Sequence, residues 1–368
     1  MTEQEDKMRG YGSFAVRDAV IQKEKKRERG FGVSFKGAKL RKSIPSLRWL
    51  VQALYTLFYV LVGVEFSYFY TGIIEGNFHL YRPPAVEGFL PIGSLLGLRH
   101  FLATGTYDSV HPAGLTIIMA VIVSALLSRK SFCAWICPVG CLSRMIEQGN
   151  KRLLKNRITV PPLLDHLLMS VKYALCAFFI YVIFFKMSVK DVEMFLSSPY
   201  NIAADAKMLM FFLDMSRPTL IVLLAIVALS ALVKNFWCRY LCPYGALLGV
   251  ISFFSPLSVK RDAGVCIDCR SCSRECPYQI RVHQKSSVRT VECTACLNCV
   301  STCPVDDCLT VNYFGKKRLK ELTVPLLLLA VILSFYLAAR VTNHWESRVD
   351  SGTFARFYSI AETLDHPR

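Results

Sequence analysis

The sequence predicts an α-helical integral membrane protein. It has about five transmembrane helices in a parallel internal repeat, and a small α+β di-cluster ferredoxin domain of the bacterial type is inserted before the last helix. Three observations support this fold class. The mean hydropathy is +0.36 and 53% of the residues are hydrophobic, which is too apolar for a water-soluble chain of 368 residues. Two segments share a cysteine motif, and eight further cysteines between Cys266 and Cys303 follow the spacing of bacterial ferredoxins.

Residues 1–45 are predicted to form a basic cytoplasmic tail. Residues 1–48 hold thirteen lysines and arginines, and no apolar stretch of the kind found in a cleavable signal peptide is visible. The run KEKKRERG at 23–30 suits contact with anionic lipid. A net charge of +17 would also suit a nucleic-acid-binding protein. Because the basic residues cluster beside apolar spans, we expect membrane lipid as a partner and no nucleic acid.

Five apolar segments predict the membrane topology. They are residues 47–68, 111–128, 166–186, 218–233 and 322–340. Lysine and arginine are frequent before the first span, after the second and before the last, but the loops at 69–110 and 187–216 are poor in them. Because basic loops stay in the cytoplasm, the N-terminus and the ferredoxin domain are expected there, and the tail 342–368 is expected outside. The expected location is the cytoplasmic (inner) membrane of a bacterium.

The membrane part divides into two similar units, residues 46–155 and 156–258. Val86-Glu87-x-Phe89-Leu90 in the first unit matches Val192-Glu193-x-Phe195-Leu196 in the second, and both units contain a Cys-x3-Cys-Pro-x-Gly motif near their ends. Because the two units have the same orientation, the repeat is parallel, with its axis along the membrane normal. The uncharged residues 241–257 correspond to a charged segment of the first unit. We therefore expect them to form an interfacial helix and not a further span.

The two motifs supply a set of four cysteines: Cys133, Cys137, Cys238 and Cys242. Within each pair the residues are four apart, so they lie on one face of a helix where a span reaches the cytoplasmic interface. Twofold packing of the units would bring the four thiols together. Such a set suits a third iron–sulfur cluster, a soft metal such as Cu(I), or two disulfides. The alternative is that these cysteines only pack as small apolar side chains.

Residues 259–316 are expected to hold two [4Fe-4S] clusters. In the pattern Cys-x2-Cys-x2-Cys-x3-Cys-Pro, each run gives three ligands to one cluster and its fourth cysteine to the other. The first cluster is assigned Cys266, Cys269, Cys272 and Cys303, and the second Cys293, Cys296, Cys299 and Cys276. Structural zinc is the alternative, but zinc does not require the third cysteine or the proline. Cys308 is expected to be structural, and residues 317–341 to form the last transmembrane helix.

The motifs FCAWICPVG at 132–140 and WCRYLCPYG at 237–245, with the two ferredoxin runs, resemble a known family. It comprises the membrane polyferredoxins of the periplasmic nitrate reductase and nitrous-oxide reductase systems, with the copper-handling ferredoxin of cbb3-oxidase assembly as a relative. The resemblance implies quinol-linked electron transfer, with other redox subunits (a cytochrome, a flavoprotein or an iron–sulfur protein) as partners. RPPAVEGFLPI at 82–92 is similar to the nitrous-oxide branch, but the flavin-binding domain of that branch is not visible. Neither flavin nor haem is supported.

Three residues are candidates for quinone binding or proton transfer: His111, His100 and Glu87. Ionisable residues in or beside spans are often functional, and His111 starts the second predicted span. A solvated interfacial histidine is the alternative. Glu87 and Glu193 occupy equivalent repeat positions, which makes them either paired carboxylates or charges at helix N-termini.

The predicted function is that of a membrane-bound electron-transfer subunit of a respiratory oxidoreductase complex. It would pass electrons between the quinone pool, or a membrane redox partner, and the [4Fe-4S] clusters. Two alternatives stay open. One is a copper reductase or metal-handling protein that uses the Cys-x3-Cys-Pro thiols. The other is a non-catalytic anchor and electron relay for a soluble complex.

Overall fold

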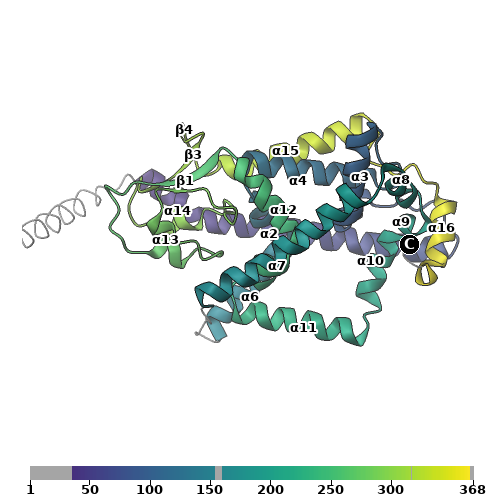
Figure 1. Ribbon diagram of the computed structural model, residues 1–368, viewed down its shortest axis with the longest axis horizontal. Coiled ribbons are helices and arrows are strands. Elements are labelled where there is room, and N and C mark those ends of the chain that lie inside the picture. Colours follow the sequence, from purple (N-terminus) through teal and green to yellow (C-terminus); the bar gives the residue numbers. More distant parts are fainter. Residues whose placement is uncertain (1–34, 154–159, 316, 365–368) are drawn as a thin grey trace, which may run out of the picture. The chain divides into compact units, whose positions relative to one another are not determined.

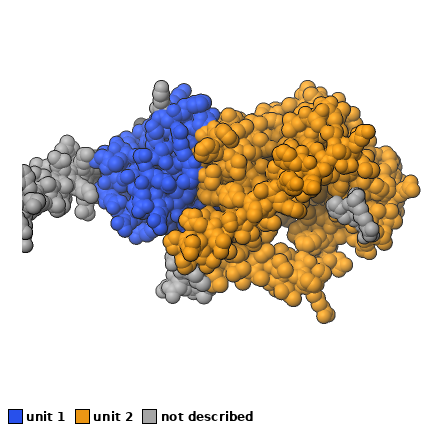
Figure 2. Space-filling model, in the orientation of Figure 1, with its two compact units in different colours: residues 1–47, 256–290, 297–322 blue, residues 48–255, 291–296, 323–368 orange. Residues whose placement is uncertain are grey.

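The computed structural model of the protein describes residues 35–153, 160–315 and 317–364. Most of the predicted basic tail lies outside these residues. The chain forms two compact units (Figures 1 and 2). The ferredoxin unit contains residues 1–47, 256–290 and 297–322, and the membrane unit contains residues 48–255, 291–296 and 323–368. The short segment 291–296 thus belongs to the membrane unit, although the ferredoxin sequence continues on both sides of it.

The ferredoxin unit is built on a four-stranded antiparallel sheet. Its strands are β1 (Leu257–Arg261), β2 (Ser287–Val288), β3 (Leu309–Tyr313) and β4 (Lys317–Leu319), in the order β2-β1-β3-β4. Val259 of β1 faces Val311 of β3, and both are buried. Its short helices are α13 (Ser271–Arg274), α14 (Asn298–Thr302) and the 3₁₀ turn η5 (Val282–Gln284). α13 and α14 contact each other, giving the α+β architecture that the sequence predicts.

The first half of the membrane unit starts with a long helix and ends at the first cysteine motif. Its elements are α2 (Phe35–Ile74), η1 (Pro84–Phe89), α3 (Pro91–Thr104), α4 (Pro112–Ser128), α5 (Ser131–Trp135) and α6 (Pro138–Leu153). Helix α2 begins before the predicted span and continues through Pro45. Helices α3, α4 and α6 start with proline, which suits the first helical turn because its missing amide hydrogen is not needed there.

The second half has a similar order of elements. They are α7 (Pro162–Tyr181), its π-helical extension η2 (Val182–Lys186), α8 (Val189–Leu196), α9 (Pro199–Ile202), α10 (Ala204–Leu213), α11 (Arg217–Leu232), the π-helical turn η3 (Trp237–Leu241), α12 (Pro243–Ile251) and η4 (Ser252–Phe254). In both halves a long apolar helix is followed by short helices, a second apolar helix and the Cys-x3-Cys-Pro turn.

Three helices of the described chain are long and apolar enough to cross a membrane. They are 43–74, 162–186 and 323–341, and α10 with α11 forms a fourth candidate that is bent by 77°. Helix α4 has 17 residues and is therefore about 26 Å long, which is less than the roughly 30 Å hydrocarbon core. Three candidate spans indicate a membrane protein, and the five-span repeat stays a prediction. The apolar 243–254 segment is also too short to cross.

The last part of the chain closes the membrane unit. Helix α15 (Thr323–Val341) packs along α4 (Figure 1), and the chain ends in α16 (Ser351–Ser359) and η6 (Ala361–Thr363). Phe354 and Tyr358 of α16 pack against Phe66 and Phe69 of α2 in one buried cluster. The sequence predicts only a tail here, whereas the structure has a helix whose aromatic side chains complete a core.

Candidate metal centres

The two Cys-x3-Cys-Pro motifs share one backbone geometry. In each motif the amide of the second cysteine donates a hydrogen bond to the carbonyl of an aromatic residue five positions earlier. Cys137 donates to Phe132 and Cys242 donates to Trp237, both at 3.0 Å. A hydrogen bond between residues five positions apart is π-helical, and single π-helical turns often occur at functional sites. The sequence correspondence between the motifs thus extends to their local structure.

The second cysteine of each motif directly precedes a helix. The Cys242 Sγ accepts a hydrogen bond from the Gly245 amide at 3.2 Å. Burial raises the pKa of Cys137 to about 11, although the amides of Gly140 and Val139 lower it. A Cβ at Gly140 would collide with the carbonyl oxygen of Cys133, so glycine is required there. The helix N-termini favour a negatively charged sulfur at both positions.

The structure brings the four motif cysteines from the two halves close together. Burial raises the pKa of Cys133, and Cys137, Cys242 and Cys238 raise it further. Burial, Cys242 and Cys137 likewise raise the pKa of Cys238 to about 12. The hydroxyl of Ser143, on α6, lies 3.8 Å from the Cys238 Sγ. Buried thiolates are stable only beside compensating positive charge, which a bound metal centre supplies, so these residues fit a cluster.

Segment 291–296 is held against the first cysteine motif by backbone hydrogen bonds. The indole of Trp135, which is 1% exposed, donates from Nε1 to the carbonyl of Ala295 at 3.2 Å. Arg48 donates from Nη1 to the carbonyl of Cys296 at 2.8 Å. Because Trp135 lies between the two cysteines of its motif, these bonds place two ferredoxin cysteines next to the motif. The cysteines concerned are Cys293 and Cys296.

A partly buried carboxylate, that of Glu292, fixes the start of the same segment. Glu292 accepts hydrogen bonds from Lys172 Nζ at 2.8 Å, from Lys130 Nζ at 3.0 Å and from the Tyr173 hydroxyl at 2.6 Å. Burial alone would raise the pKa of Glu292, but the two lysines lower it to about 2. Glu292 is therefore ionised at neutral pH. We call these four residues the Glu292 network.

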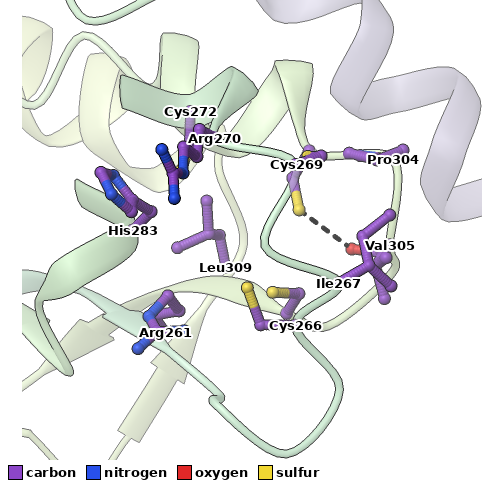
Figure 3. Close-up of a pocket in the computed structure, with 12 residues that line it drawn as sticks. Arg261, Cys266, Ile267, Cys269, Arg270, Cys272, His283, Pro304, Val305 and Leu309 are labelled. Atoms are coloured by element: carbon purple, nitrogen blue, oxygen red, sulfur yellow. Dashed lines mark hydrogen bonds between the residues drawn. The ribbon is translucent and has the colours of Figure 1, made fainter. Parts of the chain in front are cut away.

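The four thiols assigned to the first cluster line one pocket of the ferredoxin unit (Figure 3). They are Cys266, Cys269, Cys272 and Cys303. The remaining wall is apolar, apart from basic side chains that include Arg261 and Arg270. An apolar wall with basic groups suits an anionic cluster, whose potential depends on charge and solvent exposure. The residues present thus fit the group that the spacing predicts.

A fifth cysteine, Cys308, lies in the same pocket. It is 2% exposed, and hydrogen bonds with Cys303, together with burial and the nearby Cys266, raise the pKa of its thiol. Sequence reasoning treats Cys308 as structural and gives it no contact with the cluster. The structure places it beside two predicted ligands, where a neutral thiol can donate a hydrogen bond to their sulfur atoms.

The two ferredoxin runs contain residues with a left-handed backbone conformation at matching positions between their cysteines. In the first run Asp268 and Arg270 have φ of 51° and 59°, and in the second Ala295 and Leu297 have φ of 47° and 61°. Positive φ is uncommon for residues other than glycine and marks functional loops. Of the second cluster's predicted ligands, Cys293 and Cys296 belong to the membrane unit, and Cys276 and Cys299 to the ferredoxin unit. The grouping of these four stays a prediction from spacing.

Within the described residues, no three or more His, Cys, Asp or Glu side chains are grouped as the ligands of a single metal ion. Zinc gathers four thiolates at about 2.3 Å from one ion, whereas each cysteine of a [4Fe-4S] cluster binds a different iron. The ligands of such a cluster therefore stand further apart than the ligands of a single zinc ion.

Two of the three proposed quinone residues lie in a different place, a buried charge network that joins the two halves. Arg82 donates to Glu87 at 2.7 Å and to Asp205 at 2.6 Å, and the Tyr358 hydroxyl donates to Asp205 at 2.8 Å. His111 Nδ1 lies 3.5 Å from Glu87. We call these five residues the Arg82 network.

The other candidates lie outside the Arg82 network. His100, on α3, is partly exposed and contacts the Thr106 hydroxyl at 3.3 Å. Glu193 is exposed on α8, whereas its repeat counterpart Glu87 is fully buried, so the two do not form a carboxylate pair. Sequence reasoning missed Arg82, Asp205 and Tyr358, because their partners come from distant parts of the chain.

Two family models match the cysteine-bearing parts of the chain. One, described as a 4Fe-4S binding domain, matches residues 110–161 and again residues 218–261. The other, described as a 4Fe-4S dicluster domain, matches residues 258–304. The first model therefore covers both Cys-x3-Cys-Pro motifs, and the second covers all eight ferredoxin cysteines.

The chain is also 38% identical over 315 residues to the putative electron transport protein YccM of Escherichia coli. The match covers 83% of this chain and 88% of YccM. The chain belongs to the membrane polyferredoxin family. This polyferredoxin is 26% identical over 278 residues to the ferredoxin-type protein NapH of E. coli, with 71% of the polyferredoxin and 88% of NapH covered.

Protein NirI of Paracoccus denitrificans is 28% identical to the polyferredoxin over 209 residues, which cover 53% of the polyferredoxin but only 29% of NirI. No solved structure matches the chain. The 4Fe-4S domains and these relatives support electron transfer as the general role of the polyferredoxin.

Proposed function

We propose that the polyferredoxin is an electron-transfer subunit of a respiratory oxidoreductase complex in a bacterial inner membrane. It passes electrons between the quinone pool, or a membrane redox partner, and its [4Fe-4S] clusters. The N-terminus and the ferredoxin unit face the cytoplasm and the C-terminal tail lies outside, as the distribution of basic residues indicates. Other redox subunits of the complex supply or accept the electrons.

The proposal includes a third cluster, held by Cys133, Cys137, Cys238 and Cys242. Three findings support it: the thiols lie close together, helix N-termini face the second cysteine of each pair, and a 4Fe-4S binding domain matches both motifs. Iron–sulfur clusters transfer single electrons. The same findings favour a cluster over copper at these thiols.

The observation that carries the proposal is the position of segment 291–296. Trp135 of the first motif bonds to Ala295, and Lys130, just before that motif, bonds to Glu292. The segment that carries the predicted ligands Cys293 and Cys296 is therefore held against the first motif. A protein that only anchored a soluble ferredoxin would not need its motif cysteines beside the cluster loop.

The test measures electron exchange in anaerobically purified, full-length protein. A short-chain quinol analogue is added to oxidised protein, a quinone analogue to reduced protein, and cluster oxidation state is followed by EPR. We expect exchange in at least one direction, and slower exchange in Cys133→Ser. Cys176→Ser, outside both motifs, is the matched control and should behave like the wild type. Intact clusters that exchange no electrons with either analogue would favour the anchor-and-relay function instead.

A further inference from the structure

The membrane unit contains a cavity of about 740 Å³ between α2, α4 and α15. Helix α4 packs along α15, whereas α2 lines the opposite wall. The α2 residues that line the cavity recur every three or four positions, as one helical face does. They are Leu54, Tyr55, Phe58, Tyr59, Val62 and Glu65. Ligand sites in proteins are typically 300–1,000 Å³ and mostly apolar with few polar groups, and this cavity has that size and character.

One end of the cavity reaches the first cysteine motif. Phe132 and Ile136 line it, and each directly precedes a motif cysteine, Cys133 and Cys137. Tyr59 lines the same cavity from α2. A molecule in the cavity would therefore lie beside the proposed third cluster.

The cavity also contains polar groups that a hydrocarbon chain does not need. Glu65 is a carboxylate on a membrane-spanning helix, where an ionisable side chain is costly and by default a functional candidate. Thr116 lines the cavity from α4, and its hydroxyl lies 2.5 Å from the Tyr107 hydroxyl. The Thr116 hydroxyl already bonds to the Pro112 carbonyl as well, so Glu65 is the polar group that suits a ring hydroxyl of a quinol, whereas a lipid acyl chain has no group to bond to it.

We propose that this cavity binds the ring of a lipid-soluble quinone, and that in the quinol form a ring hydroxyl donates a hydrogen bond to the Glu65 carboxylate. The inference rests on the proposed function and assigns the place where the protein exchanges electrons with the quinone. Oxidation of one quinol to the quinone releases two electrons and two protons. When bound, the [4Fe-4S] clusters would supply two one-electron acceptors, while Glu65 would hold one of the two protons and water would receive the other. His111, His100 and Glu87 do not line the cavity, so they are not its quinone ligands.

The first test is photolabelling of full-length protein in lipid nanodiscs with an azido-quinone analogue, followed by peptide mapping. We expect label on α2, α4 or α15, and protection by unlabelled short-chain quinone. Ile117→Trp, which fills the cavity, should abolish the protected label, while Val60→Trp on the exposed face of α2 should not. EPR spectra of the clusters confirm that each variant is folded. Label outside the cavity, or equal protection by added phospholipid, would overturn the proposal.

Glu65→Gln provides the second test, with Glu75→Gln at the exposed end of α2 as control. Loss of the hydrogen bond from a quinol hydroxyl to a charged carboxylate should weaken competition by quinol roughly tenfold in Glu65→Gln, with no change in the control. If Ile117→Trp still exchanges electrons with quinol at the wild-type rate, the site is wrong but the proposed function stands. If the wild type neither binds nor exchanges electrons with the analogue, both fail.

Discussion

Two charge networks in the membrane unit, the Glu292 network and the Arg82 network, differ in their charge and in their neighbours. The Glu292 network sets two lysines against one carboxylate, and Lys130 lowers the pKa of the nearby Cys133 and Cys238. The Arg82 network sets one arginine and one histidine against two carboxylates, Glu87 and Asp205. The first network is therefore rich in positive charge and lies beside cysteines, whereas the second is rich in carboxylates.

From this difference we expect the Glu292 network to support the clusters and electron transfer, and the Arg82 network to stabilise the fold. Excess positive charge beside thiolates stabilises an anionic cluster, and the same lysines hold the segment that carries Cys293. The Arg82 network instead ties η1 to α10 and, through Tyr358, to α16. Loss of the Arg82 network should therefore lower stability without removing iron, and loss of the Glu292 network should alter the clusters.

Asp205→Asn should have the largest effect. It leaves the buried Arg82 guanidinium short of one carboxylate and should lower the free energy of unfolding by about 3–5 kcal/mol. Chemical denaturation in detergent micelles measures this. Asp214→Asn, an exposed carboxylate just after the same helix, should leave stability unchanged. Lower iron per folded molecule in Asp205→Asn, with unchanged stability, would remove the distinction between the two networks.

Glu292→Gln should have a smaller and more local effect. It leaves two buried lysines with a neutral partner, which should weaken the attachment of segment 291–296 by about 2–3 kcal/mol. We expect altered magnetic interaction between reduced clusters in EPR. Glu275→Gln is the control, because Glu275 also directly precedes a predicted cluster ligand but is exposed. Identical EPR spectra for Glu292→Gln and wild type would show that the network does not position the clusters.

Trp135→Phe should weaken the same attachment less. It removes one hydrogen bond to Ala295 but keeps most of the buried aromatic ring. Loss of that hydrogen bond should lower the free energy of opening of the segment by about 1 kcal/mol. Hydrogen exchange of the 291–296 backbone should increase, while total iron stays constant. An unchanged exchange rate would show that the indole does not hold the segment.

The pH dependence should be the smallest effect. The pKa of Glu292 is lowered to about 2, against about 4.3 in an unfolded chain. Its stabilising contribution is fully present above that unfolded value and is lost as pH falls toward 2. Hydrogen exchange of segment 291–296, corrected for its intrinsic pH dependence, should therefore give the same opening free energy from pH 5 to pH 8. A fall in that free energy between pH 7 and pH 5 would contradict an ionised Glu292 in this range.

The sequence was most informative where chemistry depends on spacing. Local sequence patterns identify the ferredoxin cysteines, the doubled Cys-x3-Cys-Pro motif and the main apolar helices. These features depend on residues that are close in the sequence. Long-range partners are not visible in this way. Asp205 and Tyr358 look like ordinary surface residues until α10 and α16 pack beside Arg82, and Glu292 pairs with lysines more than a hundred positions away. The sequence does not predict the bend between α10 and α11, because apolar composition does not determine the angle between two helices.

Iron and sulfide content tests the central claim most directly. Wild-type protein, purified without oxygen, should contain about twelve iron atoms per chain, four for each of three clusters, and Cys133→Ser with Cys238→Ser should contain about eight. About eight in both proteins would contradict a cluster at the four motif cysteines. Zinc in place of iron at the ferredoxin cysteines would contradict the electron-transfer account as a whole.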